Sequence, residues 1–386
     1  MQIPNCSINS TVVSIHVDVS KAFDSCNHDI LKAKMKRIGL SGSSFELLAS
    51  YMKDREQEVW CDNKYGGIFS INIGVGQGTI LGPTFFKIYI ADMHLATNLF
   101  SLRFADDTNL IGTGNDKIIA QDNINNELDK LYKWFCSNKL TLHPNKSRYI
   151  VHSKDKMINI MLGGQQLMRC GYEMQEEGVK FLGVIIDENL DWRLHVKHIR
   201  KKIGKGNYLL WRYKRKLTLA MKQTLYESFI RCHLLYCLPV WGAKKTATLT
   251  ELKSQIKKIW SKIGQRRMHT NERLIEHKIL KLEDELKISE IKIIWSWEKK
   301  KIPLGLSTIL TERTNVNLRN RSFIREQCWK QDSIAYRLAT RANKEMNEIQ
   351  IAKSKKGLSN KYRNREFLIE YAAPCRIRHC FICSAH

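Results

Sequence analysis

The sequence is poor in proline, in acidic residues and in long apolar runs, and each shortage excludes a class of protein. Only 6 of its 386 residues are proline and 43% are hydrophobic, so the composition is that of a folded protein rather than a disordered basic one. No stretch approaches the roughly 18 apolar residues that a membrane-spanning helix needs. The first residues also lack a basic head followed by an apolar block, so we expect neither a secretory signal nor a membrane partner.

The shortage of acidic residues points to a polyanionic partner. The chain has 64 Lys and Arg against 38 Asp and Glu, a formal net charge of +26. The segment from Arg193 to Lys301 holds 28 basic and 9 acidic residues, so most of the surplus lies there. With no membrane segment in view, nucleic acid is the favoured partner, and a merely solvated basic face is the alternative.

The cysteines predict a reducing environment. Eleven of them are scattered along the chain, which is an odd number and unlike the dense, short pattern of a secreted disulfide framework. We therefore expect an intracellular protein of the cytoplasm, the nucleus or both. Near the end, Cys375, Cys380, Cys383 and His386 are spaced unlike the usual zinc motifs, so free thiols are the default and a zinc site the alternative.

The hydrophobic pattern up to about residue 187 alternates between strand and helix periods. Apolar residues at every second position predict a strand over Val12–Val19, and Asn27 is placed to cap a helix that ends near Gly39. Further along we expect helices over Ser43–Lys53 and Phe85–Ala96, a hairpin over Leu102–Ile111, a long helix carrying Ile124, Leu128, Leu131 and Phe135, and strands over Glu58–Cys61, Ile68–Ile73, Arg148–His152 and Lys180–Asp187. This order predicts an α+β fold, an antiparallel sheet with helices on one face.

Carboxylates stand on two of the predicted central strands. Asp18 lies on the polar side of the first strand, and Asp106 and Asp107 lie at the turn of the hairpin. Carboxylates placed there need a partner, and Mg²⁺ prefers such oxygen ligands. From spacing alone the alternative is ordinary turn chemistry, because Asp tolerates turn backbone geometry well.

Five strings in order resemble one family. They are VDVSKAFDSCNHDIL (17–31), SYMKDREQEVW (50–60), GVGQGTILGPTFFKIYIADM (74–93), FADD (104–107) and KFLGVIID (180–187). Together they resemble the reverse transcriptase of non-LTR (LINE-type) retrotransposons. The resemblance implies an RNA-directed DNA polymerase that uses two Mg²⁺ ions, with Mn²⁺ as an alternative, and that takes an RNA template, a DNA primer and deoxynucleoside triphosphates.

The resemblance also implies roles for single residues. Asp18, Asp106 and Asp107 match the metal-binding, catalytic aspartates. Four further residues match positions that bind the nucleotide or the template: Phe23, whose ring would exclude a 2′-hydroxyl, Gln77, Gly78 and Phe104. Without the resemblance, Phe23 is an ordinary core aromatic and the glycine loop a helix-entry turn.

Two further matches concern the end of the reaction and the primer. Lys146 matches a lysine proposed to donate a proton to the leaving pyrophosphate, and Leu182 and Gly183 lie at the centre of the string that matches the primer grip. Read from residue types alone, Lys146 is a solvated lysine and the string a buried strand.

The family pattern implies three domains and also shows two departures. We expect a palm over 1–187, a basic, all-helical thumb over 188–303 and a helical or irregular tail over 304–386. Only about eleven residues precede the Asp18 strand, so the fingers and the endonuclease of complete family members are expected to be missing, and Gly76 stands where the family usually has proline. A catalytically silent nucleic-acid-binding remnant of a decayed element is therefore the alternative function.

Overall fold

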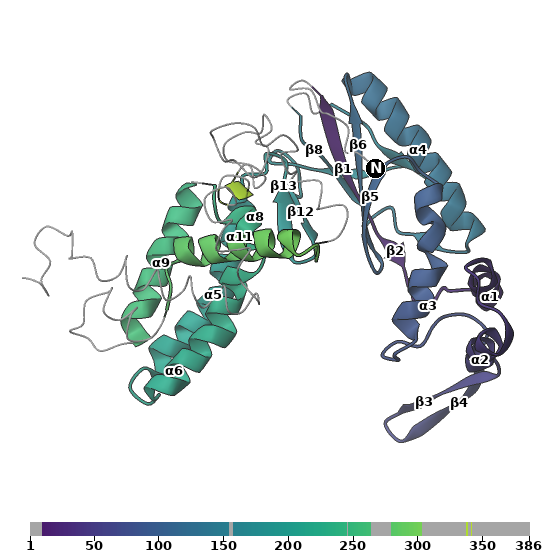
Figure 1. The fold of residues 1–386 in the computed structure, drawn as a ribbon, viewed down its shortest axis with the longest axis horizontal. Helices are drawn as coiled ribbons and strands as arrows, with labels where there is room; N and C mark the ends of the chain where they lie inside the picture. The colour runs from purple at the N-terminus through teal and green to yellow at the C-terminus, as the bar shows by residue number, and fades with distance from the viewer. Residues whose placement is uncertain are drawn as a thin grey trace, which may run out of the picture. The chain divides into compact units, whose positions relative to one another are not determined.

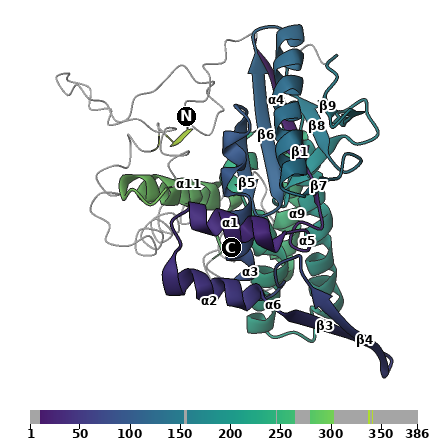
Figure 2. The same cartoon turned by 90° about the vertical axis from the view of Figure 1, so that its right-hand side faces the viewer.

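A computed structural model describes residues 10–153, 157–244, 246–263 and 279–302, together with 337, 338 and 341. The fold divides after Leu190 into two compact units, drawn in Figures 1 and 2. Each unit has its own hydrophobic core, one formed between Val13 and Leu167 and the other from Val196 onward. The cysteine-rich end with Cys375, Cys380, Cys383 and His386 lies outside the described residues.

A five-stranded sheet forms the centre of the first unit. Its strands, in spatial order, are β11 (Met168–Cys170), β8 (Arg148–Val151), β1 (Thr11–Val17), β6 (Asp107–Gly114) and β5 (Phe100–Phe104). All neighbours pair antiparallel except β11 and β8, which are parallel. The strand predicted here is confirmed and Val13, Ile15 and Val17 are almost completely buried, but Ser14 and His16 on its other face are buried as well, because β1 is the central strand of the sheet.

Helix α4 (Lys117–Ser137) packs along one face of this sheet, as both views show. Its predicted apolar stripe, Ile124, Leu128, Leu131 and Phe135, is buried. Two glycines of β6 allow the close approach. A Cβ on Gly112 would lie 2.3 Å from the Ile124 side chain, and one on Gly114 would lie 2.7 Å from Ala120. The predicted α+β class, an antiparallel sheet with helices, is confirmed.

Two helices and a ribbon follow the first strand. Asn27 caps α1 (His28–Arg37) as predicted, because its Oδ1 accepts from the backbone N–H groups of Asp29 and Ile30 at 3.1 Å. Helix α2 (Gly42–Met52) leads into the ribbon of β3 (Arg55–Cys61) and β4 (Lys64–Ile71). This ribbon projects from the sheet and keeps nearly all of its side chains exposed.

The apolar segment expected to be one helix over 85–96 is divided. Helix α3 (Gly82–Tyr89) ends early, and the 3-10 turn η1 (Ala91–Leu95) follows. Two carbonyl groups at this end of the helix accept hydrogen bonds from side chains. Lys34 Nζ donates to Tyr89 O at 2.5 Å, and Arg103 Nη1 donates to Ile90 O at 2.7 Å. The prediction of a single helix was therefore wrong.

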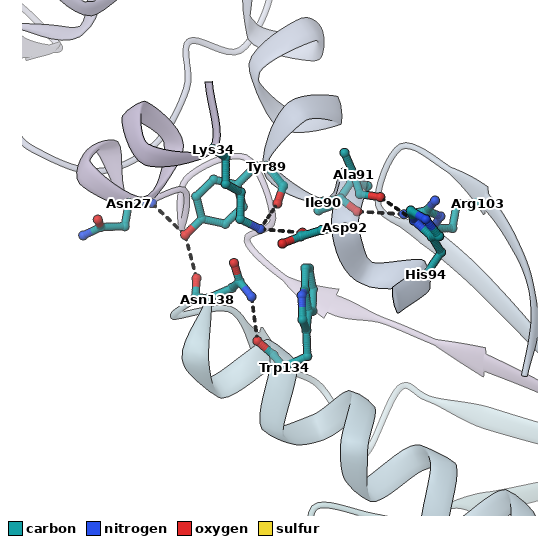
Figure 3. A network of polar contacts seen from close by, with 10 residues as sticks. All are labelled: Asn27, Lys34, Tyr89, Ile90, Ala91, Asp92, His94, Arg103, Trp134 and Asn138. Carbon is teal, nitrogen blue, oxygen red and sulfur yellow. Dashed lines mark hydrogen bonds and ion pairs between the residues drawn. The ribbon is translucent and has the colours of Figure 1, made fainter. Parts of the chain in front are cut away.

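Lys34 is the centre of the polar network that joins α1, α3 and α4 (Figure 3). Its Nζ also donates to Asp92 Oδ1 at 2.7 Å and lies 4.8 Å from the centroid of the Trp134 ring. The Tyr89 hydroxyl donates to Asn138 O at 2.6 Å and accepts from the Asn27 backbone N–H at 3.2 Å. Burial lowers the pKa of Lys34, and the hydrogen bond that Lys34 donates to Asp92 opposes that shift.

Replacing Asp92 by alanine should destabilise the first unit by about 2 kcal/mol, because it leaves the half-buried Lys34 ammonium without its carboxylate. Urea unfolding followed by circular dichroism measures the change. Asp129→Ala is the matched control, since it removes an exposed ion pair to Lys133 (2.7 Å) and should cost less than about 0.5 kcal/mol. Equal losses in the two variants would contradict the role given to Lys34.

Short strands complete the first unit. Strand β2 (Val19–Ser20) pairs with β7 (Thr141–Leu142), and β9 (Met161–Leu162) pairs with β10 (Gln165–Gln166). The stretch 180–187, expected as one strand, is instead most of a hairpin of β12 (Gly178–Phe181) and β13 (Val184–Asp187). The turn between them needs left-handed backbone at both Leu182 (φ 45°) and Gly183 (φ 82°), which is the geometry of a tight two-residue hairpin loop.

The second unit is helical in its described part. Its helices are α5 (Arg193–Tyr213), α6 (Leu219–Tyr226), the π-helical turn η2 (Glu227–Arg231), α7 (Cys232–Leu235), α8 (Leu238–Trp241), α9 (Ala247–Ile263) and α11 (Leu282–Glu298). They share a core that includes Ile203, Trp241 and Ile256. None of the helices described in either unit has the length and apolar character needed to cross a bilayer.

Candidate active site

Asp18 lies at the point where the central strand leaves the sheet. Strand β1 ends at Val17, and the chain then pairs with β7 through Val19 and Ser20, so the predicted continuous strand 12–19 is interrupted at Asp18. Both backbone groups of Asp18 are held: its N–H donates to Ser147 Oγ at 3.1 Å, and its carbonyl accepts from the His143 N–H at 2.9 Å. This anchoring fixes the backbone of the half-buried Asp18, which directly precedes Val19, a lining residue of the pocket described below.

The second pair of carboxylates lies at the predicted hairpin turn. Phe104 pairs with Asp107, so Ala105 and Asp106 form the loop between β5 and β6, and Ala105 has left-handed backbone (φ 55°). Asp107 is thus the first residue of β6, and both aspartates are exposed. The pairing of β1 with β6 ends with Val17 opposite Thr108, so Asp18 and Asp107 are the residues that directly adjoin its last pair.

The electrostatics agree with this proximity. The pKa of Asp107 is raised by partial burial and then by the negative charges of Asp106 and Asp18. Such mutual repulsion is relieved by a cation, and carboxylate oxygens are the ligands that Mg²⁺ prefers. The carboxylate oxygens therefore suit a divalent metal. Among the described residues, however, no group of three or more Asp, Glu, His or Cys side chains is arranged to hold one metal ion.

A pocket of about 440 Å³ opens beside Asp106. Its lining comes from the start of β2, from the glycine loop before α3 and from the hairpin turn, and consists of Val19, Lys21, Ala22, Phe23, Gln77, Gly78, Pro83 and Asp106. Four residues singled out from the sequence thus meet in one cavity: Phe23, Gln77, Gly78 and Asp106. Lys21, which supplies a cation at the wall, was missed, since nothing in its sequence context distinguishes it from other lysines.

Phe23 is held as part of the pocket wall. Its ring stacks on the buried Phe86 of α3, with centroids 4.8 Å apart and an interplanar angle of 21°. Its carbonyl accepts from the Val75 N–H at 2.8 Å, so its backbone is tied to the glycine loop. The side chain is half-buried, which leaves part of the ring available to the cavity.

The glycine loop is shaped by backbone that other residues adopt poorly. Gly74 has φ 90°, its carbonyl binds His28 Nε2 at 2.7 Å, and a Cβ there would lie 3.0 Å from the Asp24 carbonyl oxygen. Gln77 Nε2 donates to Asp24 Oδ1 at 2.9 Å. Gly78 has φ 78° with open space on its Cβ side, so the backbone is accessible from the pocket.

The remaining predicted residues lie at three turns. Lys146 is exposed in the turn 143–147, the same turn that anchors Asp18 through His143 and Ser147, two residues that the sequence did not suggest. Phe104 is 65% exposed at the end of β5. Leu182 and Gly183 form the β12–β13 turn, and the ring of the neighbouring Phe181 lies 5.6 Å from that of His16 on the central strand.

Comparison with known proteins finds similar sequences. The family model described as "Reverse transcriptase (RNA-dependent DNA polymerase)" matches residues 5–186. An RNA-directed DNA polymerase from the mobile element jockey of Drosophila funebris is 26% identical over 265 residues, covering 65% of this chain and 28% of its own. The jockey polymerase of Drosophila melanogaster is 24% identical, and the match covers 31% of its length. The probable polymerase from transposon BS of the same species is 27% identical over 248 residues.

The chain therefore spans less than a third of the length of these relatives. Among solved structures, the telomerase from Candida albicans is similar at 15% identity, with a TM-score of 0.31 over 77% of this chain and 48% of that one.

Proposed function

Because residues 5–186 belong to the reverse transcriptase family and the chain is homologous to the RNA-directed DNA polymerases of non-LTR retrotransposons, we propose that this chain carries the template-directed DNA synthesis of such an element. In this proposal the first unit is the palm and the basic helical unit is the thumb. RNA would be the template, DNA the primer, and deoxynucleoside triphosphates the substrates. Such a polymerase would work where these are present, in the cytoplasm or the nucleus.

The observation that carries the proposal is a carboxylate in the pocket wall with two others next to it along the chain or in charge. Asp106 lines the cavity that also contains Phe23 and Gln77, and the charges of Asp106 and Asp18 both raise the pKa of Asp107. A nucleotide in the cavity would have its phosphates beside the carboxylates. The raised pKa of Asp107 supports a shared cation there.

Asp18, Asp106 and Asp107 would hold two Mg²⁺ ions, which when bound stabilise the attacking and leaving oxygens of phosphoryl transfer. The other residues bind and orient. Phe23 would close the pocket against the sugar, Gln77 and the Gly78 backbone would lie along the nucleotide or template, and Lys146 would hold a proton near the leaving group. The Leu182–Gly183 turn would contact the primer end.

Primer extension on an RNA template tests the proposal. The chain should incorporate deoxynucleotides in the presence of Mg²⁺, either alone or joined to a fingers segment from a jockey-type polymerase. A matched Asp18→Asn form serves as the inactive reference. If the chain extends no primer, either alone or joined to the fingers segment, while it still binds nucleic acid, the silent-remnant alternative is the better description.

Mg²⁺ should raise the melting temperature of the chain, because a cation relieves the repulsion among the three carboxylates and binds only the folded arrangement. Asp18→Asn should abolish the shift, and Asp122→Asn, on the exposed side of α4, should keep it. The shift should weaken on acidification at a pH above the usual range for aspartate, since a raised pKa makes Asp107 bind a proton earlier. A shift of equal size in Asp18→Asn would place the cation elsewhere.

Nucleic-acid affinity should fall steeply with salt, because the basic unit would neutralise phosphates. Each contact contributes about −0.9 to the slope of log affinity against log salt on duplex DNA. Replacing Lys201 and Lys205 of α5 by alanine should make the slope shallower by about 2. Lys253→Ala is the control, since that lysine is already paired with Glu283 at 2.6 Å. A flat salt response of the parent chain would mean that this face does not bind phosphates.

A further inference from the structure

The solvent side of α5 carries two aromatic rings that no part of its own core covers. Helix α5 buries Val196, Ile199, Ile203, Gly206 and Leu210 on one side. Tyr208 and Trp211 lie on the opposite side, 58% and 53% exposed, with ring centroids 6.2 Å apart. Large exposed rings in an otherwise charged surface mark a place where something binds.

The charges around the two rings have one sign. Helix α5 contains no acidic residue at all. Lys197, Lys201, Lys205 and Arg212 share its exposed side, and no hydrogen bond or ion pair joins them to any residue that the structure describes. Arg200, which points toward α9, pairs with Glu251, and Arg193 at the start of the helix pairs with Asp191 at 2.8 Å. This concentration of one charge sign among the described residues favours a polyanion as the partner of this side.

The surface also leaves room along the helix. Gly204 lies on the same side between Lys201 and Lys205, and a Cβ there would meet nothing within 4 Å. The side thus presents three lysines with an open position among them, then the two rings and Arg212, over about four turns of helix. A backbone of phosphates could follow the cations while bases reach the rings.

We propose that Tyr208 and Trp211 form a stacking platform for unpaired nucleotides, so that this side of α5 binds single-stranded nucleic acid. The proposal deepens the polymerase function proposed above, because it gives one surface of the basic unit a ligand distinct from duplex. Bases in a duplex are already stacked on each other, whereas unpaired bases offer free faces to aromatic rings. The flanking lysines add phosphate neutralisation and cation–π contact.

Binding of the full chain to a labelled oligouridylate, the matching oligothymidylate and a duplex of the same length tests the proposal. Trp211→Ala and Tyr208→Ala should each weaken single-strand binding about tenfold and leave duplex binding unchanged. The salt slope should stay the same, because no phosphate contact is lost. Comparing the two oligonucleotides shows whether RNA or DNA is preferred.

Further variants distinguish stacking of a base on an aromatic ring from contact with apolar surface in general. Trp211→Phe should retain most of the affinity, and Trp211→Leu should lose it. Trp60→Ala is the matched control, because that tryptophan is 65% exposed on β3 of the other unit. Unchanged single-strand affinity in the Tyr208→Ala, Trp211→Ala double variant would overturn the platform and assign the rings to another partner, such as a protein. That outcome would leave the primer-extension result untouched, so the two proposals fail separately.

Discussion

Asp18→Asn and Asp107→Asn should each lower DNA synthesis by about a thousandfold or more. Metal ions at such sites contribute several kcal/mol of transition-state stabilisation, and each 1.36 kcal/mol is a factor of ten in rate. Asparagine keeps the size of the side chain and its hydrogen-bonding oxygen, so the fold should be unchanged while the charge proposed to bind the cation is lost. Single-nucleotide primer extension under single-turnover conditions measures the rate.

Two comparisons separate a loss of chemistry from a loss of structure. Asp122→Asn, an equally conservative change on α4, should leave the rate unaltered. Affinity for template and primer should also survive in Asp18→Asn, because the basic unit is untouched. Synthesis at the parental rate in either active-site variant would remove the three carboxylates from the mechanism.

The second large effect is expected in sugar selection. Phe23→Ala should improve ribonucleotide incorporation relative to deoxynucleotides by about tenfold to a hundredfold, because it removes the ring that we propose fills the space of a 2′-hydroxyl. The ring is well placed for this function, since it stacks on Phe86 at 4.8 Å and lines the same pocket as Asp106. Competition between the two sugars on one template measures the ratio.

Phe23→Tyr supplies the control, because it keeps a ring of similar reach and should keep the selectivity. Thermal unfolding of both variants shows whether lost packing on Phe86 matters. If Phe23→Ala slows both sugars equally, or only lowers the melting temperature, then Phe23 is a core aromatic and the pocket binds the sugar differently.

The local features of the first unit were predictable because they depend on neighbouring residues. The stripe of α4, the Asn27 cap and the hairpin around Asp106 each follow from spacing or from one side chain. The division of the 85–96 helix was not predictable, because it depends on Lys34 and Arg103 donating to carbonyl groups of distant segments. Likewise, nothing near Val19 shows that it pairs with β7.

The candidate site follows the same rule. The aspartates could be named from the sequence, whereas their approach depends on the register of β1 with β6, which no local pattern sets. The anchoring of Asp18 by Ser147 and His143 spans more than a hundred residues and carried no sequence signal. Pocket residues from three segments were found together only because the family resemblance connected them.

The separation of the two cores bears on how the chain is made. Every residue of the main core of the first unit lies between Val13 and Leu167, so that core is complete well before the basic helices have been translated. The chain leaves the ribosome from its N-terminus, so all the strands of the sheet emerge before α5, and the sheet can close around α4 while the basic helices are still being synthesised or held in the exit tunnel. The candidate site would thus be assembled before the cationic helices emerge.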